Sequence, residues 1–271
     1  MRSGVAALDA EWQRAQAELH RRCAAKLGAV GMSPAGLAYV RRMKGYPRIP
    51  YFAALWVRDP ELRRELGVAI CTHAIGIKLI DDLMDRDQPI EPWDQILGVY
   101  LLQHSTATFG AHARPAEVLR VFDEDYDVIW REQVHEAQRP ADSLASWVHY
   151  ARIKSGRMMM CYASAACLAA DAPAALPAAR AFAEAFGVLF MIGDDLRDFR
   201  QLGEAGGNLV HLVRTGRVDL ADAVAAIGHW RETALRALAD CPPVHPVADF
   251  MAGFADRLVT IAGECVHADV R

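Results

Sequence analysis

FMIGDDLRD, residues 190–198, is an apolar stretch that ends in three aspartates, and IKLIDDLMD, residues 77–85, repeats the pattern. In an α-helix, residues three and four apart share a face, so Asp194 and Asp198 point the same way and Asp195 reaches Asp198. Three like charges on one turn repel each other, and Mg²⁺ prefers carboxylate oxygens as ligands. The two pentads therefore predict a metal clamp. Its six predicted catalytic and metal-binding carboxylates are Asp81, Asp82, Asp85, Asp194, Asp195 and Asp198.

Ordinary solvated acidic caps at helix ends are the alternative explanation of either pentad. Two matching pentads with nearly identical apolar approaches are harder to explain in this way. The apolar residues just before each pentad also imply burial, where an unneutralised charge is costly. We therefore favour a metal site over two unrelated surfaces.

Length and composition predict one helical domain with a large core. The 271 residues contain no Ser/Gly linker and no abrupt change of composition, so we expect a single domain over 1–271. Hydrophobic residues make up 53%, and Ala and Leu are abundant, which favours an all-α protein whose core could house an apolar ligand. The formal net charge of −4 provides no broad basic field, so nucleic acid is not an expected partner.

The cysteines and the apolar runs indicate the cellular compartment. The six cysteines lack the C-x-x-C spacing of zinc sites and the density of a disulfide scaffold, so we expect reduced core thiols. The longest apolar run, residues 158–170, is too short to span a bilayer, and no secretory apolar region follows Met1. The sequence therefore predicts a soluble, cytoplasmic protein without stable membrane insertion.

Helical periodicity predicts a bundle of about eight to eleven helices. The expected helices cover residues 5–27, a stretch from 34, and then 60–85, 92–112, 115–138, 142–170, 173–202, 219–239 and 245–268. The helices that precede the two pentads resemble one another, and if they faced each other they would form a cup with an acidic rim and an apolar wall. A metal–diphosphate head and an apolar tail would fit such a cup.

Beside the pentads, the Lys154-Ser155-Gly156 stretch and the Phe190 approach to Asp194 complete a recognisable set. In these features the sequence resembles the trans-isoprenyl diphosphate synthase and class I terpene synthase superfamily, over most of the chain. The resemblance implies an isoprenoid synthase-type helical bundle around a deep apolar cavity. It also implies three Mg²⁺ ions, an allylic prenyl diphosphate as substrate, and a homodimer.

Further site residues are predicted around the pentads. Lys154 is the expected catalytic cation, and Arg152 and Arg157 are expected to hold diphosphate oxygens, although solvated charge explains Arg152 as well. Small or aliphatic residues before the first pentad leave room for a long tail, so we expect a C15–C20 substrate, with C20 favoured. The predicted substrate-binding wall consists of Gly76, Ile77, Tyr162, Phe186, Phe190 and Met191, for whose aromatic members ordinary core packing is the alternative.

The chain departs from the resembling enzymes where chain elongation needs a second, metal-free diphosphate site. Their Gly-Lys-Arg-x-Arg-Pro stretch is here GYPRIP, residues 45–50, and the arginine pair expected after the first pentad is replaced by RDQPIEP, residues 86–92. A poor pocket for a second anion favours an enzyme that ionises its substrate and quenches the cation internally. The leading prediction is therefore a Mg²⁺-dependent terpene cyclase that releases diphosphate.

Three alternatives stay open. The chain could be a trans-prenyl diphosphate synthase, condensing an allylic diphosphate with isopentenyl diphosphate, in which other cations rebuild the acceptor site. The candidate cations are Arg41, Arg42, Lys44, Arg48 and Arg86. It could transfer a prenyl group to another acceptor, for which there is no dedicated motif. It could also be a non-catalytic subunit, but the six intact carboxylates argue against that reading.

Overall fold

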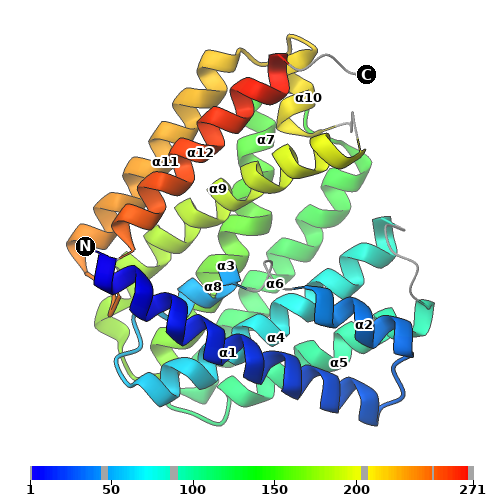
Figure 1. The fold of residues 1–271 in the computed structure, drawn as a ribbon, viewed down its shortest axis with the longest axis vertical. Coiled ribbons are helices and arrows are strands. Elements are labelled where there is room, and N and C mark those ends of the chain that lie inside the picture. The colour runs from blue at the N-terminus through cyan, green and yellow to red at the C-terminus, as the bar shows by residue number, and fades with distance from the viewer. Residues whose placement is uncertain (1, 44–47, 86–90, 203–206, 246, 268–271) are drawn as a thin grey trace. The chain divides into compact units, whose positions relative to one another are not determined.

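The computed structural model describes residues 2–43, 48–85, 91–202, 207–245 and 247–267. Side chains are not described at 2–6, 82–85, 92, 95, 200–202 and 265–267. Within these ranges the chain forms helices and no strand, so the predicted all-α class is confirmed (Figure 1).

The chain divides into two compact units, each assembled from separate segments. Unit 1 comprises Met1–Phe122, Ser164–Ala174 and Pro243–His245, and unit 2 comprises Asp123–Ala163, Ala175–Pro242 and Pro246–Arg271. Two α-helices cross the boundary: α6 (Pro115–Gln138) between Phe122 and Asp123, and α8 (Arg157–Ala169) between Ala163 and Ser164. The 3-10 turn η3 (Pro173–Ala175) is also divided, between Ala174 and Ala175. The first acidic pentad falls in unit 1 and the second in unit 2.

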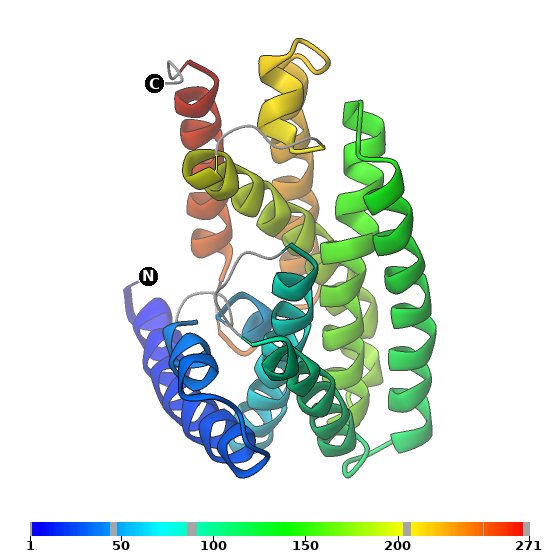
Figure 2. The ribbon, with the colours of Figure 1, turned by 90° about the vertical axis from the view of Figure 1, so that its right-hand side faces the viewer.

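Unit 1 is built around the packing of α4 against its neighbours. Figure 2 shows α1 and α2 side by side. Helix α4 contacts α1, α3, η1 and α5. The bounds are α1 (Arg2–Ala29), α2 (Pro34–Arg42), α3 (Arg48–Tyr51), the 3-10 turn η1 (Phe52–Ala54), α4 (Pro60–Asp85) and α5 (Pro92–Phe109).

Two glycines allow α4 and α5 to cross closely. A Cβ at Gly76 would lie 2.8 Å from the Gly98 carbonyl oxygen, and a Cβ at Gly98 would lie 2.6 Å from that of Gly76. Real Cβ atoms do not approach carbonyl oxygens so closely, so only glycine fits at this crossing. Gly76, predicted to line the substrate wall, thus lies in the contact between α4 and α5, one turn before the first pentad.

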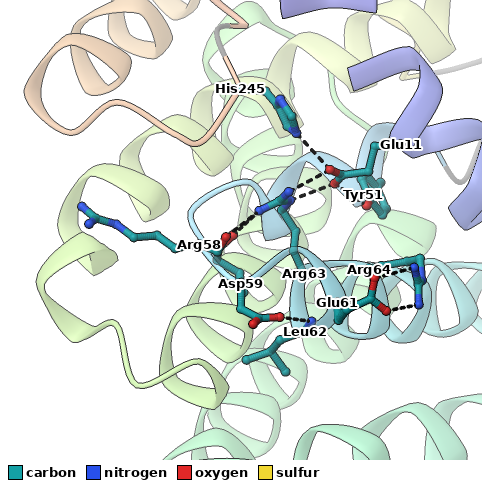
Figure 3. Close-up of polar contacts among 10 residues, drawn as sticks. Glu11, Tyr51, Arg58, Asp59, Glu61, Leu62, Arg63, Arg64 and His245 are labelled. Atoms are coloured by element: carbon teal, nitrogen blue, oxygen red, sulfur yellow. Dashed lines mark hydrogen bonds and ion pairs between the residues drawn. The ribbon is translucent and has the colours of Figure 1, made fainter. Parts of the chain in front are cut away.

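A buried ion pair anchors α1 to α4 in unit 1 (Figure 3). Arg63 donates from Nε to Glu11 Oε1 and from Nη2 to Glu11 Oε2, both at 2.8 Å. Tyr51 donates its hydroxyl to Glu11 Oε1 at 2.8 Å, and His245 Nε2 lies 3.0 Å from Oε2. Arg63 Nη1 also donates to the Val57 carbonyl at 2.7 Å. Glu11 and Arg63 are therefore paired and hydrogen-bonded, as buried charges must be.

The pKa of Glu11 makes this anchor sensitive to acid. Burial alone would raise that pKa, but hydrogen bonds from Arg63, His245 and Tyr51 lower it from 4.5 to about 2. A lowered pKa in the folded state means that Glu11 stabilises the fold fully above pH 4.5 and loses this contribution as the pH falls towards 2. We expect the difference in unfolding free energy between wild type and Glu11→Gln to be largest above about pH 5. Urea unfolding at several pH values checks this, and a pH-independent difference would contradict it.

Unit 2 is organised around α9, which contacts α11, α12, α10 and α7 (Figure 1). Its apolar centre includes Phe186, whose ring packs against Phe182, Phe250 and Phe254. The bounds are α7 (Leu144–Ala151), η2 (Arg152–Gly156), α9 (Leu176–Leu202), α10 (Leu209–Arg214), α11 (Leu220–Asp240) and α12 (Ala248–His267).

The helix predicted over 142–170 is interrupted by one π-helical turn, η2, at Arg152–Gly156. The turn lies against α9 where that helix has no side chain: a Cβ at Gly187 would lie 2.4 Å from the Ser155 carbonyl oxygen. Such single π turns often occur at functional sites. Here the turn carries Lys154, the predicted catalytic cation.

Gly187→Ala should therefore destabilise the protein. Forcing a methyl group into this contact costs about 1–3 kcal/mol, which outweighs the gain of up to about 1 kcal/mol that Ala brings to a helix interior. Gly228→Ala in α11 is the matched control, because nothing lies within 4 Å of a Cβ there. Chemical denaturation should show lower stability for the first variant and equal or higher stability for the second.

Among the residues that the structure describes, one helical stretch, Pro173–Phe199, is long and apolar enough to cross a membrane by length and composition. The run singled out in the sequence, residues 158–170, is not the one that meets this test. More than half of the apolar window in Pro173–Phe199 is buried against the rest of the protein, as in the core helix of a soluble protein. Cys23, Cys71, Cys161 and Cys167 are buried and form no disulfide, as expected for reduced core thiols, whereas Cys241, also without a disulfide, is half-buried.

Candidate functional site

The first pentad ends α4, and Asp81 is the one of its aspartates whose side chain the structure describes. That side chain is 37% exposed, and its Oδ2 lies 3.2 Å from Lys78 Nζ in an i,i+3 ion pair. Ile77, predicted to line the wall, is half-buried one turn earlier. The side chains of Asp82 and Asp85 lie outside the described part of the chain, so their roles stay predictions.

The second pentad places two of its carboxylates together on one face of α9. Asp194 and Asp198 have side chains 28% and 41% exposed, and both contact Arg197. Arg197 Nη1 lies 2.9 Å from Asp194 Oδ1, and Nη2 lies 3.1 Å from Asp198 Oδ1. The guanidinium thus neutralises two carboxylates that would otherwise repel each other.

Asp195 has different surroundings from these two neighbours. Its Oδ2 accepts hydrogen bonds from Trp147 Nε1 at 2.8 Å and from the Leu209 backbone N–H at 2.6 Å. Burial raises the pKa of Asp195 to about 7, although both hydrogen bonds oppose the rise. Among residues with described positions, no three His, Cys, Asp or Glu side chains are arranged to hold a metal ion. The expected binding of one ion by Asp194, Asp195 and Asp198 stays a prediction.

The three predicted diphosphate-binding cations each pair with a carboxylate of another helix. Lys154 Nζ contacts Glu136 of α6. Arg157 Nε donates to Asp125 of α6 at 2.8 Å, and Arg152 Nε donates to Glu184 of α9 at 2.8 Å. Their carboxylate partners are Asp125, Glu136 and Glu184, which sequence analysis did not single out. The acidic run DEDYD at 123–127 was the available signal for the first of these.

The predicted aromatic wall divides into buried and accessible members. Tyr162 and Phe186 are fully buried, and the Tyr162 hydroxyl accepts a hydrogen bond from Tyr126 at 3.1 Å. Both therefore fill the core of unit 2, in agreement with the alternative of ordinary packing. Phe190 and Met191 are half-buried, one turn before the second pentad. These two remain the members of the set within unit 2 that a ligand could contact without disturbing the core.

A small apolar cavity lies behind Asp195 in unit 2. Its volume is about 20 Å³, and its lining includes Leu196, Val213 and Ile227. This is room for about one water molecule, far too little for a prenyl chain. The cavity therefore belongs to the packing of α9, α10 and α11.

Comparison with known proteins assigns the fold. No protein-family model and no curated protein matches the sequence. Solved structures do match, and they define the class: the chain has the all-α fold of the trans-prenyl diphosphate synthases. At the low identities involved, this likeness establishes the fold and no more.

Three solved structures illustrate the match. An FPP/GFPP synthase from Zymomonas mobilis has a TM-score of 0.65 at 18% identity, covering 96% of this chain and 99% of its own. A polyprenyl synthase from Roseobacter denitrificans has a TM-score of 0.65 at 19% identity, covering 93% and 99%. A geranyltransferase from Helicobacter pylori has a TM-score of 0.63 at 14% identity, covering 97% and 98%.

Proposed function

We propose that this chain is a Mg²⁺-dependent enzyme that ionises an allylic prenyl diphosphate and transfers the prenyl group, as a trans-prenyl diphosphate synthase does. The observation that carries the proposal is the presence of an acidic pentad at the C-terminal end of both α4 and α9, in a chain with the fold of prenyl diphosphate synthases. The similar structures named above are synthases and a geranyltransferase. They favour transfer over the cyclisation that the sequence alone suggested.

The donors present suit Mg²⁺. Asp81, Asp194 and Asp198 offer partly exposed carboxylate oxygens, each already facing a cation, Lys78 or Arg197. Hard oxygen ligands of this kind are those that Mg²⁺ takes in proteins. We propose that Asp194 and Asp198 bind Mg²⁺ in unit 2, and that Asp81, Asp82 and Asp85 bind Mg²⁺ in unit 1. Bound Mg²⁺ would neutralise the negative charge that develops on the diphosphate as the allylic C–O bond breaks.

The cations of unit 2 complete the proposed leaving-group site. Lys154 and Arg157 are held by carboxylates of α6, so their side chains are in place before a ligand arrives. A bound diphosphate would compete with Glu136 and Asp125 for these charges, and Arg presents a fork that suits phosphate oxygens. Arg152 is exposed and contacts the Trp230 ring, 5.9 Å from its centroid. Of the three cations, Arg152 is therefore the weakest candidate for diphosphate binding.

A terpene cyclase is the second candidate, and the proposed acceptor cations of unit 1 favour it. Arg48 forms an ion pair with Asp9, and Arg42 lies over the Tyr39 ring, 6.0 Å from its centroid. Arg41 is exposed at the end of α2. Lys44 and Arg86, the other candidate cations, lie outside the described residues. A second diphosphate would therefore have to displace Asp9 to use Arg48.

Product analysis separates the two candidates. The full-length protein is incubated with Mg²⁺, a C10, C15 or C20 allylic diphosphate, and labelled isopentenyl diphosphate. Label in a longer prenyl diphosphate establishes the transferase, and a hydrocarbon or alcohol formed without isopentenyl diphosphate establishes the cyclase. If the enzyme neither consumes any allylic diphosphate nor releases diphosphate, both candidates are wrong.

We also propose that the protein is cytoplasmic and forms a homodimer. Helix α5 supports the second point, because it exposes three large apolar side chains on successive turns: Trp93, Ile96 and Val99. Large exposed apolar groups at this spacing are typical of interaction surfaces. Analytical ultracentrifugation of wild type and Ile96→Glu tests the dimer, and the variant should shift the equilibrium towards monomer.

A further inference from the structure

The contacts of Asp195 differ in kind from those of the aspartates beside it. Asp194 and Asp198 contact the Arg197 guanidinium on a partly exposed face, whereas Asp195 is hydrogen-bonded to two other helices. We propose that Asp195 is a positioning residue and not a metal ligand, and that Trp147 and Asn208 hold the second acidic motif in place through it. This inference rests on the proposed function, since it assigns roles within the same metal site.

Two buried donors converge on one oxygen of Asp195. Trp147 is 1% exposed, so its indole N–H needs a protein acceptor, and Asp195 Oδ2 supplies it at 2.8 Å. The Leu209 N–H is the first of α10 and has no acceptor within that helix, and the same Oδ2 accepts it at 2.6 Å. A metal ion on Oδ2 would have to displace two hydrogen bonds that have no replacement.

Asn208 closes the arrangement from the other side. Its Oδ1 accepts from the Val210 N–H at 2.8 Å and so caps α10, while its Nδ2 donates to the Asp195 carbonyl oxygen at 2.9 Å. One residue of α9 is therefore bound through its side chain and its backbone to α7 and α10. Residues that orient metal ligands in this way affect metal affinity without contacting the ion.

The helix geometry explains why this contact matters for the ligands. Asp194 and Asp198 are four residues apart and share a face, while Asp195 is rotated about the helix axis by about 100° from Asp194 and about 60° from Asp198. Fixing Asp195 between α7 and α10 fixes the rotation of α9 about its axis at the motif. Asp194 and Asp198 are then held on the partly exposed face without depending on the metal to order them.

The test measures Mn²⁺ binding to the full-length protein in the presence of inorganic pyrophosphate, followed by electron paramagnetic resonance, so that turnover is not needed. We expect Asp195→Ala and Trp147→Phe each to weaken Mn²⁺ binding about 10–100-fold. Because both donors meet one oxygen, the amide oxygen of Asp195→Asn can accept both hydrogen bonds. Asp195→Asn should therefore recover most of the Mn²⁺ affinity and bind Mn²⁺ less than about 10-fold more weakly than wild type.

The control for the Asp195 variants is the same pair of substitutions at the neighbouring residue, Asp194→Ala and Asp194→Asn. If Asp194 is a ligand, the amide does not restore binding, and the two variants should be equally defective. A thermal melt without metal should show Asp195→Asn near wild type, and the ¹⁵N-labelled Trp147 indole signal should remain that of a hydrogen-bonded N–H.

Two results overturn the proposal and are distinct from one another. If wild type binds Mn²⁺ with pyrophosphate but Asp195→Asn loses binding as completely as Asp194→Asn, then Asp195 is a ligand, and the proposed function stands. If wild type binds neither Mn²⁺ nor pyrophosphate, the metal function fails, and the positioning role fails with it. Should Asp195→Ala not fold, the comparison of the two Asn variants still decides.

Discussion

Replacing Asp194 and Asp198 together by Ala is expected to lower kcat by about 10³-fold or more, because metal neutralisation of a leaving group supplies several kcal/mol of transition-state stabilisation. Both side chains are partly exposed, so their removal should leave the fold intact. Release of diphosphate from an allylic substrate, measured at saturating Mg²⁺, checks the expectation. Circular dichroism and a thermal melt of the same sample confirm folding.

Asp256→Ala is the matched control for this double variant. Asp256 lies in α12 of the same unit, its side chain is 70% exposed, and it also faces an arginine, Arg231, at 3.8 Å. Loss of a surface ion pair of this kind costs about 0–1 kcal/mol in stability and should not affect turnover. If the double variant retained the activity of this control, the second pentad would have no catalytic role.

Arg63→Ala is expected to destabilise the protein by about 3–5 kcal/mol, the range found when one partner of a buried ion pair is removed. The Arg63 and Glu11 side chains are only 4% and 9% exposed. Without Arg63, Glu11 keeps its contacts to Tyr51 and His245 but has lost both guanidinium hydrogen bonds. Chemical denaturation of the wild type and the variant gives the difference in unfolding free energy.

The adjacent Arg64 provides the control for Arg63. Arg64 also forms ion pairs, with Glu18 and Glu61, but its side chain is 33% exposed (Figure 3). Arg64→Ala should therefore cost no more than about 1 kcal/mol. If Arg63→Ala and Arg64→Ala lowered the unfolding free energy equally, burial would not determine the strength of these ion pairs.

The helices were predictable because their signals are local. The helix predicted over 60–85 is α4, and the apolar approach to Asp194 marked the course of α9. The interruption at η2 was not predictable, because it depends on Gly187 of another helix, which admits the Ser155 carbonyl. The six-residue α10 was also missed, since its first N–H groups are satisfied by Asn208 and by the distant Asp195.

The sequence predicted which charged residues form the candidate site, but not their contacts with other helices. Helical spacing grouped Asp194 with Asp198, and the shared contact with Arg197 agrees with this. Spacing could not show that Asp195 faces Trp147, because that contact joins residues 48 apart in the sequence. For the same reason the carboxylate partners of Lys154, Arg157 and Arg152 were not anticipated, and neither was the use of Gly76 in helix packing.

Unit 1 is assembled from segments that are far apart in the sequence, and this affects how it folds during synthesis. Its last segment, Pro243–His245, comes after most of unit 2, yet the Val244 N–H donates to the Leu55 carbonyl and His245 reaches Glu11. On the ribosome, the first 122 residues must therefore wait for nearly the whole polypeptide to emerge before their last tertiary contacts can form. A nascent chain stalled before Pro243 would leave Glu11 without its imidazole partner, so we expect the two units to complete folding late and together.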